Sequence, residues 1–135
     1  MKVTGQCHCG KISYEAEVDP ATVRVCHCTD CQKLTGTAFR TNIATLPGTY
    51  RLTSGAPKIY IKTAESGTKR AHAFCPDCGT PLYATSTDPN PASYGLRLGG
   101  LDQRAELPAP ARQVWCRSAL PWSMNIEAIT QVERQ

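Results

Sequence analysis

The sequence predicts a mainly β fold built from small antiparallel sheets, and three observations support this. Ten glycines and ten prolines among 135 residues are too many for a helical bundle and suit many short strands and turns. Short runs rich in β-branched and aromatic residues recur between turn-forming segments. The chain shows no alternation of strands with long helical patterns, which argues against a parallel sheet with crossover helices.

Eight short segments carry the strand pattern. They are residues 11–18, 39–45, 50–53, 58–64, 70–74, 81–85, 94–98 and 113–116. In the run from 58 to 63, Ile59 and Ile61 alternate with polar residues, which is typical of a strand with one buried face. One short helix is predicted over 29–34, with Thr29 as its N-cap and Gly36 at its end.

Length and composition predict a single domain covering residues 1–135. A chain of this size buries roughly two thirds of its unfolded surface, which is enough for an independent core. With 41% hydrophobic and 19% charged residues, it is too apolar for a disordered chain. No apolar run reaches the ~18 residues of a membrane span, and no secretory signal begins the sequence. We therefore expect a cytoplasmic protein with reduced thiols and no membrane partner.

Seven of the eight cysteines fall into three tight groups, and this is the strongest signal in the chain. The groups are Cys7 with Cys9, then Cys26, Cys28 and Cys31, then Cys75 with Cys78. An even number of cysteines also suits a disulfide framework. The spacings are those of metal ligands, however, and the expected compartment is reducing, so the metal interpretation is favoured.

The segment Cys75-Pro-Asp-Cys78-Gly79 has the shape of a zinc knuckle, in which the glycine accepts a positive φ. A closed tetrahedral site needs two further thiolates, and Cys7 and Cys9 are the natural partners. The alternative is a redox dithiol, but that motif opens a helix within a βαβ unit, whereas a turn into a strand follows here.

The free energy of zinc binding is large enough to join these two distant cysteine pairs. Cys9 and Cys75 lie 66 positions apart (residue 9 to residue 75), and closing such a loop costs about 4 kcal/mol of chain entropy. A structural zinc site contributes roughly 10 to 16 kcal/mol at neutral pH. Zinc can therefore link the N-terminal segment to the middle of the chain.

The remaining group of Cys26, Cys28 and Cys31 has three members. A structural zinc takes four protein ligands, whereas a catalytic zinc keeps three and leaves one position open. The group therefore predicts a second, catalytic-type zinc site. The alternative is closure by a fourth protein ligand, for which the candidates are His27, His72 and Cys116. His27 stands between two ligands, so a solvated or supporting role is favoured for it.

With these motifs in place, the sequence resembles the glutathione-dependent formaldehyde-activating enzyme family, whose domain is shared with centromere protein V. The matching segments are GQCHCGKISY (5–14), CHCTDCQKLTG (26–36) and FCPDCGTPLY (74–83), with a weaker match in QVW (113–115) and LPW (120–122). They lie in order over most of the chain.

The resemblance implies a zinc-containing complex β fold shared with a Rab-binding guanine-nucleotide release factor. It implies a structural zinc on Cys7, Cys9, Cys75 and Cys78, and a second zinc on Cys26, Cys28 and Cys31. It also implies a carbon–sulfur lyase-type activity, the addition of a thiol such as glutathione to formaldehyde or another small aldehyde, so the expected partners are small molecules.

The residues after the second group are candidates for the substrate pocket. Thr35, Gly36 and Arg40 follow it directly, and Arg40 offers a fork for a carboxylate, although a turn and a solvated arginine are the simpler interpretation. Trp115, Trp122 and Cys116 are expected mainly in the core, and the alternative for the two tryptophans is the wall of the cleft.

The sequence leaves two other functional classes as alternatives to a thiol–aldehyde enzyme. A zinc-stabilised binding module without chemistry is the main alternative to an enzyme. Nucleic-acid binding is not favoured, because the basic residues behind the formal charge of +4 are scattered and form no stripe.

Overall fold

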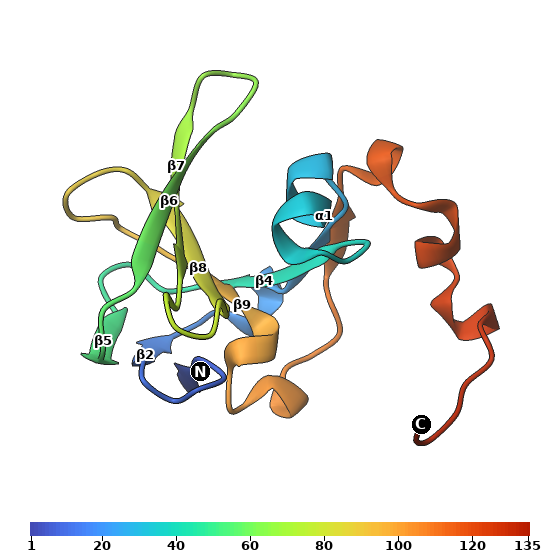
Figure 1. Ribbon diagram of the computed structural model, residues 1–135, viewed down its shortest axis with the longest axis horizontal. Helices are drawn as coiled ribbons and strands as arrows, with labels where there is room; N and C mark the ends of the chain where they lie inside the picture. The colour runs from blue at the N-terminus through green and yellow to red at the C-terminus, as the bar shows by residue number, and fades with distance from the viewer.

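The computed structural model describes residues 1–135 as two β-sheets, one short α-helix and several 3-10 turns (Figure 1). One sheet has three strands in the order β1-β2-β5, and the other has seven in the order β10-β3-β4-β9-β8-β7-β6. The strands are β1 Lys2–Gln6, β2 Ser13–Glu17, β3 Arg24–Cys26, β4 Arg40–Ala44, β5 Arg51–Ser54, β6 Lys58–Thr63, β7 Lys69–Phe74, β8 Pro81–Ser86, β9 Gly95–Arg97 and β10 Arg112–Val114.

The predicted mainly β fold with small antiparallel sheets is confirmed. Each of the eight predicted strand segments overlaps a strand, and β1 and β3 were missed because both are short and lack a run of β-branched residues. One pair departs from the antiparallel pattern, since β10 runs parallel to β3. Strands in parallel need a long connection, and here 85 positions separate Cys26 from Ala111.

The two sheets share one apolar core. In the small sheet β1 and β2 bury alternate residues, such as Val3 in β1 and Tyr14 in β2, whereas β5 is exposed along its length. They pack with Ile43, Leu82 and Leu96 from the large sheet in a single cluster of fully buried side chains. Because the turns that carry the cysteine pairs 7/9 and 75/78 leave from this core, their positions are set by it.

Gly5 in β1 allows a close contact at the centre of this core. It pairs directly with Tyr14 across the sheet, and a Cβ atom at residue 5 would lie 2.5 Å from the Tyr14 ring. The ring is fully buried and packs on Tyr50, with ring centroids 5.8 Å apart, so it has no space to move into. A strand glycine is required here by packing, not by backbone angles.

The helix α1 (Thr29–Thr35) begins and ends where local chemistry favours it. The N-cap is Cys28, whose sulfur accepts a hydrogen bond from the Cys31 N–H, and not the predicted Thr29. Gly36 ends the helix as predicted, in the left-handed conformation with φ 68°. A cysteine side chain has taken the capping role that a hydroxyl usually fills.

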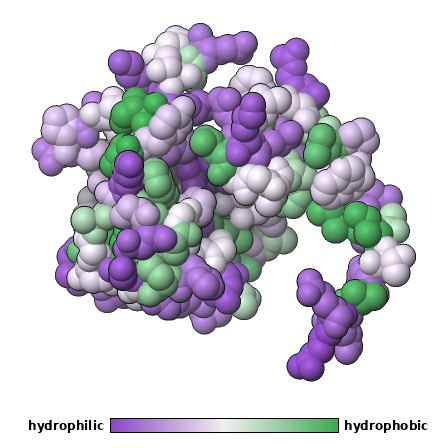
Figure 2. All heavy atoms as spheres, in the orientation of Figure 1, coloured by the Kyte–Doolittle hydropathy of each residue, from purple (hydrophilic) through white to green (hydrophobic).

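Strand β6 and the C-terminal segment are more exposed than predicted. The strand is the last in its sheet, and both Ile59 and Ile61 are exposed, so the expected buried face is absent. The segment after β10 runs away from the body in 3-10 turns (Figure 1), and Figure 2 shows apolar side chains along it. No helix has the length and apolar character needed to cross a membrane.

Replacing Gly5 by alanine tests the close contact in the core. We expect Gly5→Ala to lower the free energy of unfolding by about 1 to 3 kcal/mol, because the added methyl group overlaps the confined Tyr14 ring. Urea unfolding measures this directly. Gly99→Ala is the matched control, since a Cβ there meets nothing within 4 Å. Equal stability of the two variants would contradict the account.

Candidate metal centres and the adjoining cavity

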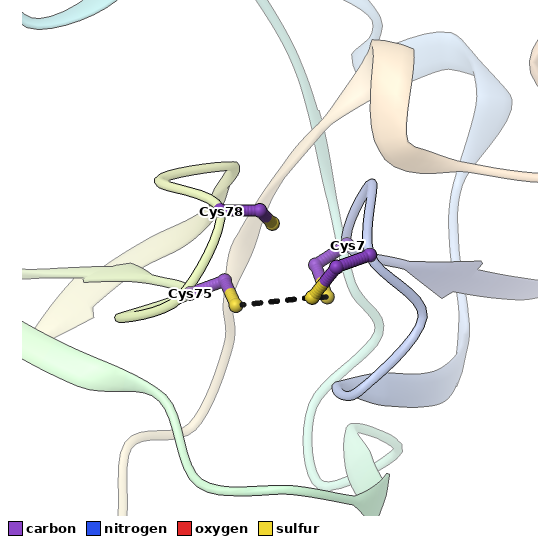
Figure 3. Close-up of side chains that lie close together, drawn as sticks. Cys7, Cys75 and Cys78 are labelled. Atoms are coloured by element: carbon purple, nitrogen blue, oxygen red, sulfur yellow. Dashed lines mark hydrogen bonds between the residues drawn. The ribbon is translucent and has the colours of Figure 1, made fainter.

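The first cysteine cluster joins two turns that are far apart in sequence. Cys7 and Cys9 lie in the turn after β1, and Cys75 and Cys78 lie in the turn between β7 and β8. The four sulfur atoms lie within 4.8 Å of one another. In Figure 3 the side chains of Cys7, Cys75 and Cys78 point toward one another from the two turns. The structure therefore brings together the four residues predicted for the structural site.

The spacing of these sulfur atoms fits a tetrahedral metal ion. The Sγ atoms of Cys7 and Cys9 are 3.5 Å apart, and those of Cys9 and Cys75 are 3.8 Å apart. Zinc–sulfur bonds of about 2.3 Å in tetrahedral geometry place sulfurs about 3.8 Å apart. A disulfide needs about 2.05 Å, and every cysteine is free. The geometry thus favours a metal site over the disulfide framework and the redox dithiol.

Both turns are fixed by backbone hydrogen bonds. The Gly10 N–H donates to the Cys7 carbonyl at 3.0 Å, and the Gly79 N–H donates to the Cys75 carbonyl at 2.8 Å. Both glycines have positive φ, 79° for Gly10 and 75° for Gly79, as the motif predicted. Each cysteine pair is therefore held in a hydrogen-bonded turn that ends in a glycine, although the turn at Cys75 is one residue longer than the turn at Cys7.

Thr80 connects the two turns and acts on one thiol. Its hydroxyl accepts from the His8 N–H at 3.0 Å and lies 3.2 Å from the Cys78 sulfur. Hydrogen bonds from the Thr80 hydroxyl, and then from the backbone, lower the pKa of Cys78 to about 5. The Cys78 thiolate that a metal requires is thus stabilised before any metal binds.

The second cluster is more compact in sequence. Cys26 ends β3, while Cys28 and Cys31 occupy the start of α1, and their three sulfurs lie within 4.8 Å of one another. Burial raises the pKa of the Cys28 thiol, but hydrogen bonds from the thiol and N–H of Cys31 outweigh it and lower the net value. Burial raises the pKa of Cys31. Cys28 is thus the thiol favoured as a thiolate, and Cys31 is the neighbour that stabilises it by hydrogen bonds.

None of the three candidates for a fourth ligand joins this cluster, which holds only Cys26, Cys28 and Cys31. His27 is fully buried and not solvated, and its Nε2 lies 2.7 Å from the Gln113 side-chain oxygen in β10. His72 lies in β7, where its Nδ1 faces Arg97. Cys116 is exposed. Three thiols without a fourth protein ligand match the open arrangement predicted from their number.

Strand β10 and the segment after it form hydrogen bonds with residues next to the cysteines of the second cluster. The His27 N–H donates to the Val114 carbonyl at 3.0 Å. The Gln32 side-chain amide donates to the carbonyls of both His27 and Ser118, each at 2.9 Å. Sequence reasoning missed Gln32 and Gln113, because nothing in their spacing marks them as partners of the cysteine loop.

A cavity of about 480 Å³ opens next to the two clusters. Thr35 and Arg40, two of the three residues predicted for the substrate pocket, line it, and so does Thr37. Gly36 does not line it and serves instead as the helix C-cap. The sulfurs of the second cluster are not in its wall, but the Thr35 hydroxyl donates to the Cys31 carbonyl at 2.7 Å. Thr35 therefore contacts both the cavity and the backbone of the second cluster.

Arg40 is buried, which corrects the simpler expectation of a solvated arginine. Only 6% of its surface is exposed, and it lies opposite Cys26 across β3 and β4. Arg97 in β9 is also buried and lines the same cavity. The sequence carries no signal for Arg97, because a strand position gives no indication that a charged side chain is buried there.

Trp115, Trp122 and Cys116 correct the expectation of core positions. Both tryptophans are 53% exposed, and Cys116 is exposed as well. All three lie at or beyond the end of β10, where the chain leaves the two sheets. Neither tryptophan lines the cavity.

The structure defines a class of protein: a small mainly β domain with two cysteine clusters that could hold metal ions, beside a cavity with buried arginines. The model of the glutathione-dependent formaldehyde-activating enzyme family matches residues 2–118, and the chain belongs to this family. A crystal structure of a Rhodobacter sphaeroides protein is similar in fold, with a TM-score of 0.62 and 23% identity over 82% of this chain and 99% of that chain.

Removing one ligand of the first cluster tests its structural role. If the cluster holds a structural zinc, we expect Cys75→Ser to leave the chain unfolded or to lower its free energy of unfolding by more than about 4 kcal/mol, because such a site contributes roughly 10 to 16 kcal/mol. Circular dichroism and metal analysis measure both effects. Cys116→Ser is the control, since this exposed cysteine lies outside both clusters. A stable Cys75→Ser protein with an unchanged metal content would contradict the assignment.

Proposed function

We propose that this protein catalyses the zinc-dependent addition of a thiol, such as glutathione, to formaldehyde or another small aldehyde. The observation that carries the proposal is the cluster of Cys26, Cys28 and Cys31, which has no fourth protein ligand and adjoins a cavity. Membership of the family supports it. The activity is formally a carbon–sulfur lyase reaction run in reverse.

The reaction forms one carbon–sulfur bond and changes no oxidation state. The thiol sulfur attacks the aldehyde carbon, the carbonyl π electrons move to oxygen, and the thiol proton ends on that oxygen as a hydroxyl. With glutathione and formaldehyde the product is S-hydroxymethylglutathione. A zinc ion held by three thiolates supplies a position for a fourth ligand and a positive charge that favours the thiolate of the incoming thiol.

The chain's own residues hold this arrangement in place. The Cys31 N–H fixes the Cys28 sulfur at the start of α1 from a distance of 3.2 Å. Thr35, the last residue of α1, lines the cavity, and its hydroxyl donates a hydrogen bond to the Cys31 carbonyl one turn earlier in the helix. We propose Thr35, Gly36 and Arg40 as the segment that contacts substrate, with Gly36 acting by ending the helix so that the chain can turn toward Arg40.

The proposed assignment of the metals follows the two clusters. Cys7, Cys9, Cys75 and Cys78 hold a structural zinc, and Cys26, Cys28 and Cys31 hold the catalytic-type zinc. Thiols kept free for metal binding fit a reducing compartment, so we propose that the reaction takes place in the cytoplasm. The fold relationship to a Rab-binding guanine-nucleotide release factor stays a prediction.

The variant Cys28→Ser separates the two clusters. We expect it to abolish turnover of glutathione with formaldehyde and to retain one of two bound zinc ions, because only the three-cysteine cluster is damaged. Serine is a good N-cap, so α1 should persist and the protein should stay folded. Product formation is measured above the uncatalysed rate, alongside circular dichroism and zinc content.

The wild type and Cys116→Ser are the controls for this experiment. Turnover by Cys28→Ser at the wild-type rate would contradict a reaction at the second cluster. Wild-type protein with two zinc ions and no turnover of any thiol with any small aldehyde would instead favour the non-catalytic, zinc-stabilised binding module.

A further inference from the structure

Two buried arginines without a carboxylate partner form the wall between two cavities. Arg40 is 6% exposed and Arg97 is 9% exposed. Both line the cavity of about 480 Å³ and a second cavity of about 260 Å³ on its other side. Burying one charged side chain is costly unless it is paired, and burying two like charges together costs more.

Arg40 has no protein partner at all. Its guanidinium makes no hydrogen bond and no ion pair, and its Nε is buried without an acceptor. The three ion pairs of the structure are Lys11–Asp77, Arg51–Glu15 and Lys62–Asp30. Arg40 thus lines a cavity without a hydrogen-bond acceptor from the protein, whereas buried polar groups are almost always satisfied.

Arg97 is held rigidly beside it, by neutral groups only. Its Nη1 donates to the Asn42 side-chain oxygen, and its Nη2 donates to His72 Nδ1 at 3.2 Å, which requires that nitrogen to be unprotonated. Its Nε is buried without a partner. Burial, followed by the charges of Arg97 and Arg40, lowers the pKa of His72 to about 4, so the imidazole is neutral and adds no charge.

The nearby carboxylates form no ion pair with the two arginines. Asp30 pairs with Lys62 at 2.8 Å. Asp102 lines the larger cavity, but it accepts a hydrogen bond from the Thr4 hydroxyl at 2.7 Å and forms no ion pair. Neither carboxylate therefore forms an ion pair with Arg40 or Arg97, and the charged groups nearest to the pair are the thiols of the second cluster.

The strand register places this pair next to the second cysteine cluster. Arg40 is directly opposite Cys26, and side chains opposite each other in antiparallel strands share a face with Cβ atoms about 5 Å apart. Arg97 is directly opposite Asn42, two residues from Arg40 and so on the same face. A group bound by both guanidiniums would lie beside the cluster.

We propose that Arg40 and Arg97 together bind a carboxylate group of a reactant in the larger cavity. The free fork of Arg40 matches a carboxylate, and Arg97 supplies a fixed second charge. The inference rests on the proposed function for the identity of the reactants. Two sources of the carboxylate are possible in chemistry: the thiol, as in glutathione, and the carbonyl compound, as in an oxo acid such as glyoxylate.

The first arm of the test measures binding without turnover. Calorimetry compares glutathione with its dimethyl ester, which lacks both carboxylates, on the zinc-loaded wild type, Arg40→Gln and Arg97→Lys. We expect Arg40→Gln to weaken glutathione binding by about tenfold to a hundredfold and ester binding by less than about threefold. Arg97→Lys retains the charge without the fork and should lie between. Arg112→Gln, an exposed arginine on β10, is the control.

The second arm locates the carboxylate on the carbonyl compound. Neutral 2-mercaptoethanol is the thiol, and glyoxylate is compared with formaldehyde as its reaction partner. If the oxo acid is the source, Arg40→Gln lowers the consumption of glyoxylate by at least about tenfold more than that of formaldehyde, while glutathione and its ester bind alike. A selective loss in either arm supports the proposal and names the source.

Stability distinguishes this role from a structural one. Because Arg40 contacts no protein group by hydrogen bond or ion pair, Arg40→Gln should melt at the wild-type temperature or above it. Equal losses of anionic and neutral ligands in both arms, or no loss in either arm, would overturn the proposal. Selective binding of the carboxylate by a protein without turnover would leave the anion site standing and reject the enzymatic function alone.

Discussion

The fold depends on the contact between two turns that carry two cysteines each. The turn after β1 belongs to the small sheet, and the turn between β7 and β8 belongs to the large one. The sulfurs of Cys9 and Cys75, 3.8 Å apart, meet over a sequence separation of 66 residues. Around them the protein has only a modest core, so a metal-sized contribution at this point outweighs what any single apolar contact supplies.

The two cysteine clusters, which could hold metal ions, differ in how the chain supplies their sulfur atoms. The first draws its sulfurs from two sheets, with each turn closed by a glycine at positive φ, and Thr80 joins the turns through the His8 N–H. The second takes all its sulfurs from one short segment, in which Cys28 also caps a helix. A ligand set from distant segments stabilises the whole fold. Ligands that all come from one segment can leave one coordination position without a protein ligand, and the rest of the fold is unaffected.

Much of this could be predicted from the residues, and the failures have physical reasons. Cysteine spacing identified both groups because metal geometry constrains sequence directly. Burial was harder to predict. Ile59 and Ile61 alternate like a buried strand face, but the strand lies at a sheet edge. Arg40 and Arg97 are charged yet buried, and only the three-dimensional cavity explains why such positions are occupied by arginine.

The parallel pairing of β10 with β3 has a consequence for the order of assembly. All ligands of the first cluster are present once residue 78 has been synthesised, but the second cluster rests on partners at Val114 and Ser118. During synthesis, which proceeds from the N-terminus at roughly 5 to 20 residues per second, the linked framework can form first. The three-cysteine centre gains its backing only when about the last sixth of the chain emerges, so a truncated chain would acquire the scaffold without a finished centre.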